Sequence, residues 1–489
     1  MSRGRAAPSH GRAEDASSLA LPLRAGTDSV RVSTLLACPL DFRYGRPEVK
    51  AIFSEEGKLQ RLLAVEAALA RAQAKVGAVP SEAAREITRR ADLAHVKAER
   101  VAEIESEIRH DLMAVVKALT EQCKGDAGRY VHLGVTSYDV IDCANALMMR
   151  DALAHIEKGL MDLETSLARL AKRHRDTVML GRTHGQAAVP MTFGLKMAVF
   201  LLETRRHLDR LREARPRIVV GKMAGAVGTA AGLGPKAFEI ADLVAQDLGI
   251  GMEDGATQIV QRDRYAEAFQ LLANLAASLE KFATEVRNLQ RTEIGEASEG
   301  FDVAKQVGSS TMAQKRNPVL AEKISGLARI VRSAVTPGYE NSIQWHERDL
   351  ANSSAERFLL PHTFVLADEI LQDSARLFHD LAVFPDRMRE NLGRAPEIMS
   401  ESVMLRLVDK GLGRQEAHEL VRKVAMKVPS DGAAAATKSA RERYRDELAK
   451  DPTVAKLLTP TELAAALDPA TYTGHAGAMV DRALAKTGF

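Results

Sequence analysis

The stretch MRDALAHIEKGLMDLETSLARL, residues 149–170, decides the fold class, because its apolar residues recur at alternating spacings of four and three. These residues are Met149, Leu153, Ile156, Leu160, Leu163, Leu167 and Leu170. Such a heptad repeat lets one face of a long helix pack along neighbouring helices. The stretch therefore predicts a long helix inside a helical bundle.

Two further segments are candidate partner helices. The first is expected to begin at Pro190, with apolar residues Phe193, Met197, Phe200 and Leu201. The second covers residues 265–290, carries one apolar face and would be about 39 Å long. Further helices are expected over residues 51–76 and 358–381, and shorter ones over residues 81–122. These patterns predict an all-α protein with a long central bundle.

The composition divides the chain into a lead and three domains. Residues 1–30 are rich in Arg, Ala and Ser without periodicity and are expected to be a disordered lead. An N-terminal helical domain is expected over residues 31–125 and the long-helix bundle over residues 126–370. A small helical domain, with turns at prolines, is expected over residues 371–489.

Charge and cysteine content exclude several classes of protein. The formal net charge of +3 is too small to indicate binding to nucleic acid or to a membrane surface. No uncharged apolar run is long enough to span a membrane. The cysteines are Cys38, Cys123 and Cys143. They have no metal-ligand spacing and cannot all form disulfides with one another, which favours a reducing compartment and a cytoplasmic location.

Residues 307–318 form a polar loop with Ser309, Ser310 and the cation Lys315. A serine hydroxyl acts as a base only where cations and backbone donors stabilise its alkoxide, and this loop has such surroundings. Asn317 is expected to cap the next helix and Pro318 to take its first position. Taken alone, however, the segment favours an ordinary solvated loop.

Three other polar segments allow two interpretations each. Arg43 and Tyr44 belong to a surface turn or to an anion site, because Arg presents a planar fork to phosphate oxygens. Thr136 and Ser137 are helix caps or hold a carboxylate at a helix start. His184, in a compact turn, has the intrinsic pKa of a general acid near neutrality.

Three of these motifs, taken in order, carry a family resemblance. HLGVTS (132–137), GRTHGQ (181–186) and GSSTM (308–312), separated by long helices, resemble the fumarase/aspartase superfamily of lyases. Four further segments are similar to the adenylosuccinate lyase family within it, namely residues 43–44, 109–111, 315–318 and 345–354. The resemblance extends from about residue 40 to the C-terminus.

The resemblance implies loss of fumarate from adenylosuccinate, giving AMP, and from the succinylated imidazole-carboxamide ribotide (SAICAR), giving AICAR, in purine biosynthesis. Ser309 is implied as general base and His184 as general acid, with His110 and Lys315 also catalytic. The implied substrate-binding residues are Arg43, Tyr44, Arg109, Asp111, Thr136, Ser137, Gln258, Asn317, Arg348, Ser353 and Arg357. His132 is expected to be structural.

The family also implies a homotetramer with a core of about 20 helices, active sites shared between subunits, and neither a cofactor nor a metal. Two residues depart from the family pattern: Ala313 replaces a proline and Ala187 a second histidine. The alternatives are a sister lyase of the argininosuccinate or carboxymuconate cycloisomerase type, or a structural scaffold without catalysis. The intact Ser309 and His184 argue against the scaffold.

Overall fold

The structure is a computed structural model that describes residues 37–300, 311–312, 314–427 and 439–489. Residues 1–44 and 45–489 form two units. In the first, the described part contains the short helix α1 (Pro39–Phe42). The predictions for residues 1–30, for Ser309 and for Ala313 lie outside the described residues.

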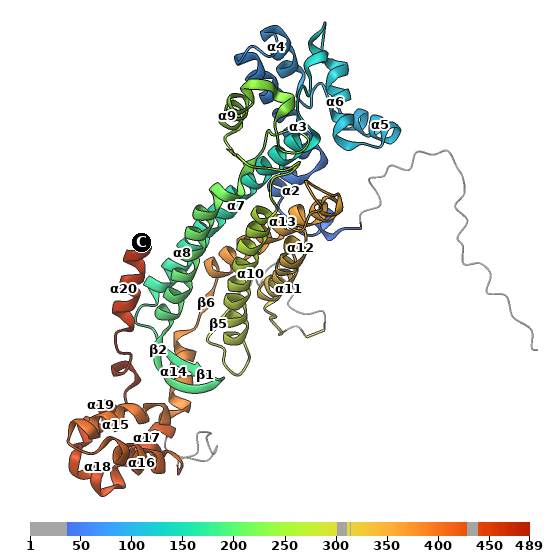
Figure 1. Cartoon of the computed structure of the whole chain (residues 1–489). Coiled ribbons are helices and arrows are strands. Elements are labelled where there is room, and N and C mark those ends of the chain that lie inside the picture. Colours follow the sequence, from blue (N-terminus) through green and yellow to red (C-terminus); the bar gives the residue numbers. More distant parts are fainter. Residues whose placement is uncertain (1–36, 301–310, 313, 428–438) are drawn as a thin grey trace, which may run out of the picture. The chain divides into compact units, whose positions relative to one another are not determined.

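The second unit begins with helices that surround the start of the bundle (Figure 1). They are α2 (Pro47–Phe53), α3 (Glu55–Lys75), α4 (Ser81–Arg90), α5 (Ala98–Ile108), α6 (Asp111–Gln122) and the 3-10 helix η2 (Ala127–Tyr130). The helix expected over residues 51–76 is confirmed as α3 from Glu55 to Lys75. Its expected start is wrong, because Ser54 is extended and its hydroxyl caps α3 by accepting the N–H of Gly57. A cap of this kind ends one helix and starts the next.

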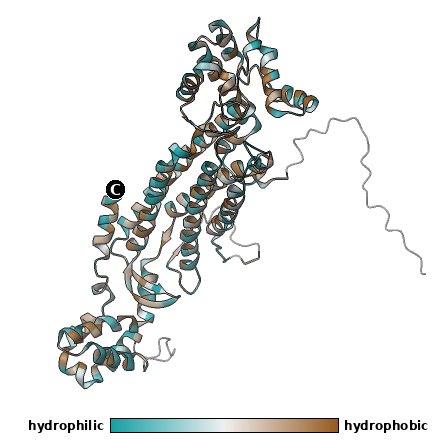
Figure 2. Ribbon diagram, viewed as in Figure 1, coloured by the Kyte–Doolittle hydropathy of each residue, from teal (hydrophilic) through white to brown (hydrophobic). Residues whose placement is uncertain are grey.

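Five helices build the bundle, and Figure 1 shows them running side by side. They are α7 (Ser137–Arg173), α8 (Phe193–Ile218), α10 (Asp263–Leu289), α11 (Val319–Ser333) and α13 (Ala351–His379). The seam residues from Met149 to Leu170 are all at most 3% exposed, so the predicted long helix with a packed heptad face is confirmed. Figure 2 shows hydrophobic and hydrophilic residues alternating along these helices, as a packed face and a polar face require.

A β-hairpin follows α7 and leads into α8. Strands β1 (Val178–Thr183) and β2 (Gln186–Thr192) pair antiparallel, with Leu180 opposite Pro190. The expectation of a helix beginning at Pro190 is therefore wrong. A proline is tolerated in such an edge strand, and the helix begins instead at Phe193, where the Thr192 hydroxyl accepts the N–H of Leu195.

The helix that contains residues 319–333, named α11 above, also begins later than expected. Its first residue is Val319, so Pro318 is at the cap position and does not open the helix, and Asn317 precedes the cap position. The carboxylate of Glu299 accepts the N–H groups of Leu320 (3.2 Å) and Ala321 (2.6 Å). A residue distant in sequence therefore caps this helix, and a cap of this kind cannot be predicted from the local sequence.

Shorter elements complete the unit. They connect the long helices and are η3 (Ala231–Lys236), α9 (Ala237–Leu248), α12 (Val335–Glu340), and the paired strands β3 (Val220–Gly221) with β4 (Gly251–Met252) and β5 (Ala297–Ser298) with β6 (Ala382–Val383). None of the described helices combines the length and the apolarity needed to cross a membrane.

The last part of the chain packs around its own apolar core. Its elements are α14 (Pro385–Arg394), η4 (Pro396–Met399), α15 (Ser400–Asp409), α16 (Arg414–Ala425), α17 (Ala440–Lys450), α18 (Pro452–Leu457), α19 (Pro460–Ala466), η5 (Pro469–Thr471) and α20 (Ala476–Thr487). That core includes Met399, Val403, Leu407 and Tyr444. The final helix α20 returns to pack on α8 and α7. The predicted all-α bundle fold is confirmed.

Candidate active site

A group of polar side chains gathers where α7 and α13 begin. We call Asp111, Tyr138, Gln258, Arg348, Ser353 and Arg357 the arginine cluster. Arg348 lies with its guanidinium 3.6 Å from the centre of the Tyr138 ring, and the Tyr138 hydroxyl donates to Ser353 Oγ at 3.3 Å. These contacts bring together residues more than 200 positions apart in sequence.

Arg348 is held rigidly and still has unused donors. Its Nη1 donates to Gln258 Oε1 at 2.9 Å, and Gln258 Nε2 in turn donates to the carbonyl of Ala226 at 3.1 Å. The Nε and Nη2 atoms of Arg348 are buried, and no described residue accepts a hydrogen bond from them. Buried N–H groups of a cation without acceptors are unfavourable, so this position is suited to an anionic ligand.

Arg357 faces a carboxylate in the same cluster. Its Nη2 donates to Asp111 Oδ2 at 2.6 Å. Burial favours the neutral carboxyl, but the N–H of Leu112 and the charge of Arg357 outweigh it and lower the pKa of Asp111. Asp111 opens α6 directly after His110, the N-cap residue, whose Nδ1 accepts the N–H of Met113. Arg109 ends α5 in the left-handed conformation, with a φ of 54°.

Thr136 and Ser137 lie at the same end of the bundle, because they start α7 just before Tyr138. The carboxylate of Asp139 fixes this start by accepting the N–H of Thr136 at 2.8 Å. It also forms a fully buried ion pair with Lys222 and accepts the N–H of Gly225. The carboxylate of Asp139 is favourable at the positive end of the helix dipole. Together with its hydrogen bonds, it fixes the backbone at Thr136 and Ser137.

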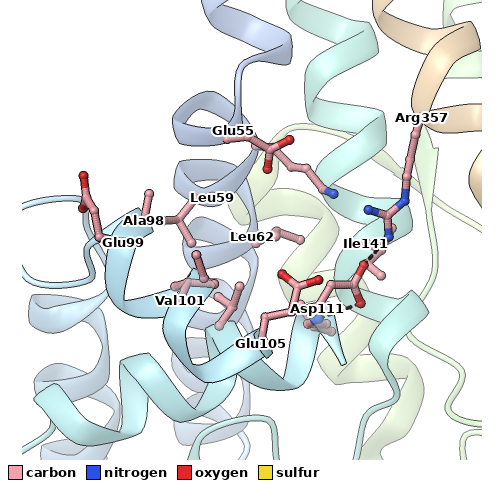
Figure 3. A pocket seen from close by; sticks show the side chains of 14 residues that line it. Glu55, Leu59, Leu62, Ala98, Glu99, Val101, Glu105, Asp111, Ile141 and Arg357 are labelled. Carbon is pink, nitrogen blue, oxygen red and sulfur yellow. Dashed lines mark hydrogen bonds and ion pairs between the residues drawn. The ribbon is translucent and has the colours of Figure 1, made fainter. Parts of the chain in front are cut away.

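A cavity adjoins the arginine cluster between α3, α5, α6 and α7. Its volume is about 340 Å³, and Figure 3 shows the Asp111–Arg357 ion pair at one side of it. Most of the lining is apolar, and charged groups lie at its margin. The apolar residues are Leu59, Leu62, Ala98, Val101, Ala102, Leu112, Val115 and Ile141. The charged residues include Glu55, Lys58, Glu99 and Glu105. It can accommodate a flat apolar group next to a charged one.

His184 lies at the opposite end of the bundle. It occupies the tip of the β1–β2 hairpin with Gly185, and both have positive φ, 54° and 74°, as a two-residue hairpin turn requires. The hairpin follows the end of α7, whereas Thr136 precedes its start (Figure 1). Because α7 has 37 residues, its two ends lie about 55 Å apart.

Lys315 and Asn317 belong to the same end as His184. Gln290, which ends α10, donates from Nε2 to the carbonyl of Arg316 at 3.1 Å. The hairpin is tied to the same connection, because Arg182 forms a bidentate pair with the buried Glu296 at 2.7 and 2.8 Å. The structure therefore separates the expected residues into two groups at the two ends of one bundle.

Three further residues named from the sequence belong to neither group as defined above. Arg43 and Tyr44 belong to the first unit, where the Arg43 guanidinium is 5.8 Å from the centre of the Tyr44 ring. His132, expected to be structural, has its Nδ1 2.7 Å from the buried carboxylate of Glu66. Burial disfavours the imidazolium, but the bond to Glu66 outweighs it and raises the pKa of His132.

The buried residues beneath the cluster were not predicted from the sequence. Arg262, Asp142, Glu356 and Asn352 form a hydrogen-bonded network with almost no exposure. A signal existed, since Asp142 continues the heptad seam one heptad before Met149. A carboxylate at a seam position needs a buried cation as partner. Among the described residues, no group of His, Cys, Asp and Glu has an arrangement suited to a metal ion.

Comparisons with known proteins agree with the helical bundle. The family model described as "Lyase" matches residues 41–333, and the model described as "Adenylosuccinate lyase C-terminus" matches residues 396–483. A fumarate lyase from Mesorhizobium sp. BNC1 has a similar structure, with a TM-score of 0.81 and 36% identity over 90% of this chain and 98% of its own. The fold and the motifs therefore define a lyase of the fumarase/aspartase class.

The comparison of sequences is more specific. The adenylosuccinate lyase of Pyrococcus abyssi is 52% identical over 91% of this chain and 96% of its own length. The chain belongs to the adenylosuccinate lyase family. The 3-carboxy-cis,cis-muconate lactonizing enzyme of Pseudomonas putida has the same fold, with a TM-score of 0.81 at 34% identity, covering 91% of this chain and 98% of its own. The fold by itself therefore does not fix the reaction.

Proposed function

We propose that this protein removes fumarate from adenylosuccinate, giving AMP, and from SAICAR, giving AICAR, in purine biosynthesis. The observation that carries the proposal within the structure is Arg348, whose Nε and Nη2 are buried with no acceptor among the described residues. With Arg357 and Ser353 in the same cluster, it supplies donors for a nucleotide phosphate. The identity to an adenylosuccinate lyase over nearly the whole chain supports the same substrate class.

The nucleotide base has a suitable place beside these donors. The cavity of Figure 3 presents apolar side chains to a flat ring, and Asp111 lies at its margin as an acceptor for exocyclic N–H groups. The two substrates share the ribose phosphate and the succinyl group, so one arginine cluster can serve both. Thr136 and Ser137 would bind a succinyl carboxylate at the start of α7, with Gln258 nearby.

The reaction itself is an elimination whose atoms balance without a cofactor. Ser309 would take the proton from the carbon beside a carboxylate, and the electron pair would form the double bond of fumarate as the C–N bond breaks. His184 would give a proton to the departing nitrogen. The intermediate carbanion is delocalised into the carboxylate, and Lys315 and Asn317 are of the types that stabilise such charge.

We propose that active sites form between chains of a homotetramer. His184 and Lys315 lie at one end of the bundle and the arginine cluster at the other, and α7, which runs between these ends, is about 55 Å long. A single substrate cannot contact both groups of one chain. Neighbouring chains packed along the long helices would supply the missing group.

The proposed location is the cytoplasm, because Cys123 and Cys143 are thiols.

The proposal is tested by following the loss of succinyl-purine absorbance with the purified protein. Ser309→Ala and His184→Ala should each lower kcat by about 100- to 10,000-fold. His379→Ala is the matched control, because this exposed histidine contacts Asp380 and lies outside both groups. Failure of the assembled wild-type protein to cleave either substrate would refute the proposal.

A further inference from the structure

Arg262 lies fully buried beneath the arginine cluster, directly before α10. Its Nε and Nη2 donate to the Glu356 carboxylate at 2.8 and 3.2 Å, and Nη1 and Nη2 donate to the Asp142 carboxylate at 3.0 and 2.9 Å. The remaining donor on Nη1 reaches the carbonyl of Val260 at 2.7 Å. All the N–H groups of this guanidinium are therefore used.

One arm of this network fixes the first turns of α13. Glu356 accepts a hydrogen bond from Asn352 Nδ2 at 2.9 Å, so both side chains face Arg262 and the core. Ser353 and Arg357 each follow one of these residues, and one step along a helix turns a side chain by about 100°. The bond from Arg262 to Glu356 thus sets the rotation of α13 that turns Ser353 and Arg357 toward the cluster.

The other arm fixes α7. Asp142 lies one helical turn after Tyr138, so the two side chains share a face. Tyr138 carries Arg348 on its ring and donates its hydroxyl to Ser353, and the Arg262 guanidinium is itself 5.8 Å from the centre of that ring. Arg262 therefore joins the two helices that present the donors of the arginine cluster.

Stability by itself gives little reason for such a network. Buried ion pairs add little net stability compared with well-packed apolar residues of similar size. A guanidinium instead fixes the relative orientation of two carboxylates, because its N–H donors lie in one plane and point in set directions. Here those carboxylates belong to α7 and α13.

We propose that Arg262 is a positioning residue for phosphate recognition. It contacts no substrate and acts through Glu356 and Asp142, which hold α13 and α7 so that Ser353, Arg348 and Arg357 bind the phosphate of the nucleotide. The inference rests on the proposed function, since that function assigns the phosphate to the arginine cluster. It predicts that Arg262 governs affinity for the phosphate and not the elimination step.

The test is Arg262→Lys, which keeps the positive charge and loses the fork. Calorimetry should show the Kd for AMP rising about tenfold or more, while the Kd for adenosine changes less than about twofold. In kinetics, KM for adenylosuccinate should rise with kcat nearly unchanged. Equal losses of affinity for AMP and adenosine would overturn the proposal, because they would indicate general damage to the site.

Two further variants complete the design. Arg205→Lys is the matched control, because Arg205 forms a bidentate pair with the buried Glu164 at 2.6 and 2.8 Å between α8 and α7. It should keep the wild-type affinity for AMP. Glu356→Gln removes the charge that orients Arg262 but keeps an acceptor oxygen, and its affinity for AMP decides the question if Arg262→Lys does not fold. Wild-type affinity for AMP in folded Arg262→Lys, or in Glu356→Gln if Arg262→Lys does not fold, would overturn the proposal.

Calorimetry also separates this inference from the proposed function. Binding of AMP needs no turnover, so a wild-type protein that binds AMP and does not cleave adenylosuccinate would refute the proposed reaction only. In that case, the comparison of AMP with adenosine in Arg262→Lys still tests the positioning role.

Discussion

Mixing two inactive variants should restore activity if active sites form between chains. The variants are His184→Ala, which removes the proposed acid at the hairpin tip, and Arg348→Ala, which removes the central donor of the arginine cluster. In one chain these residues lie at opposite ends of α7, a helix of 37 residues and thus about 55 Å long. Each site must therefore take His184 from one chain and Arg348 from another.

The expected magnitude follows from this geometry. In tetramers formed at random from equal amounts of the two variants, about half of the hairpins and about half of the arginine clusters are intact. Since the two come from different chains, about one quarter of the sites combine an intact hairpin with an intact cluster. The mixture should thus recover about one quarter of the wild-type activity per site.

The assay combines subunit exchange with turnover of adenylosuccinate. The purified variants are mixed, dissociated with urea, reassembled, and checked for mixed tetramers by native mass spectrometry before activity is measured. A mixture of Arg348→Ala with Arg357→Ala is the control and should stay inactive, because both residues belong to one cluster on one chain. Mixed tetramers without restored activity would show that His184 and Arg348 do not meet between chains.

Three further predictions concern stability. Burial lowers the pKa of His207 to about 4, so the unfolded state binds more protons at this residue below pH 6.5. His207 should therefore contribute a loss of about 2 kcal/mol in the free energy of unfolding between pH 7 and pH 5. Urea titrations at the two pH values measure this contribution as the difference between the wild-type protein and His207→Asn, which should lack it. Lys222→Met leaves the buried carboxylate of Asp139 without its cation and should cost about 3–5 kcal/mol in urea denaturation, a loss that adding Asp139→Asn should largely reverse. Leu163→Ala in the buried seam should lower the free energy of unfolding by about 3 kcal/mol in urea denaturation. The control is Met161→Ala, at a side chain 43% exposed, which should change it by less than about 0.5 kcal/mol. Similar losses for the two variants would contradict the assignment of Leu163 to the packed face.

The seam helix could be predicted well, and its neighbours less well. The heptad repeat of residues 149–170 gave both the helix and its buried face, because periodicity is a local property that directly reports which side is packed. The start of α8 was predicted at Pro190 and is at Phe193, since a hairpin pairs residues on both sides of His184. Strand pairing depends on a partner strand, which local periodicity does not specify.

The expected site residues show the same division. Arg348, Ser353 and Arg357 could be named as candidates from the sequence, because the segment that resembles the family contains them within ten positions. Tyr138, which lies between Arg348 and Ser353, was not singled out, because its partners are more than 200 positions away. The cap of α11 by Glu299 was missed for the same reason.

The sequence by itself determined the helical bundle, the family and the residue types available for chemistry. It could do so because helical periodicity and motifs are properties of short segments. Only the tertiary structure decided that His184 and the arginine cluster lie at opposite ends of one bundle, and that Arg262 joins Asp142 to Glu356 across 120 and 94 positions. The physical reason is that a buried charge must find its partner in space, and the choice among distant carboxylates depends on how whole helices pack.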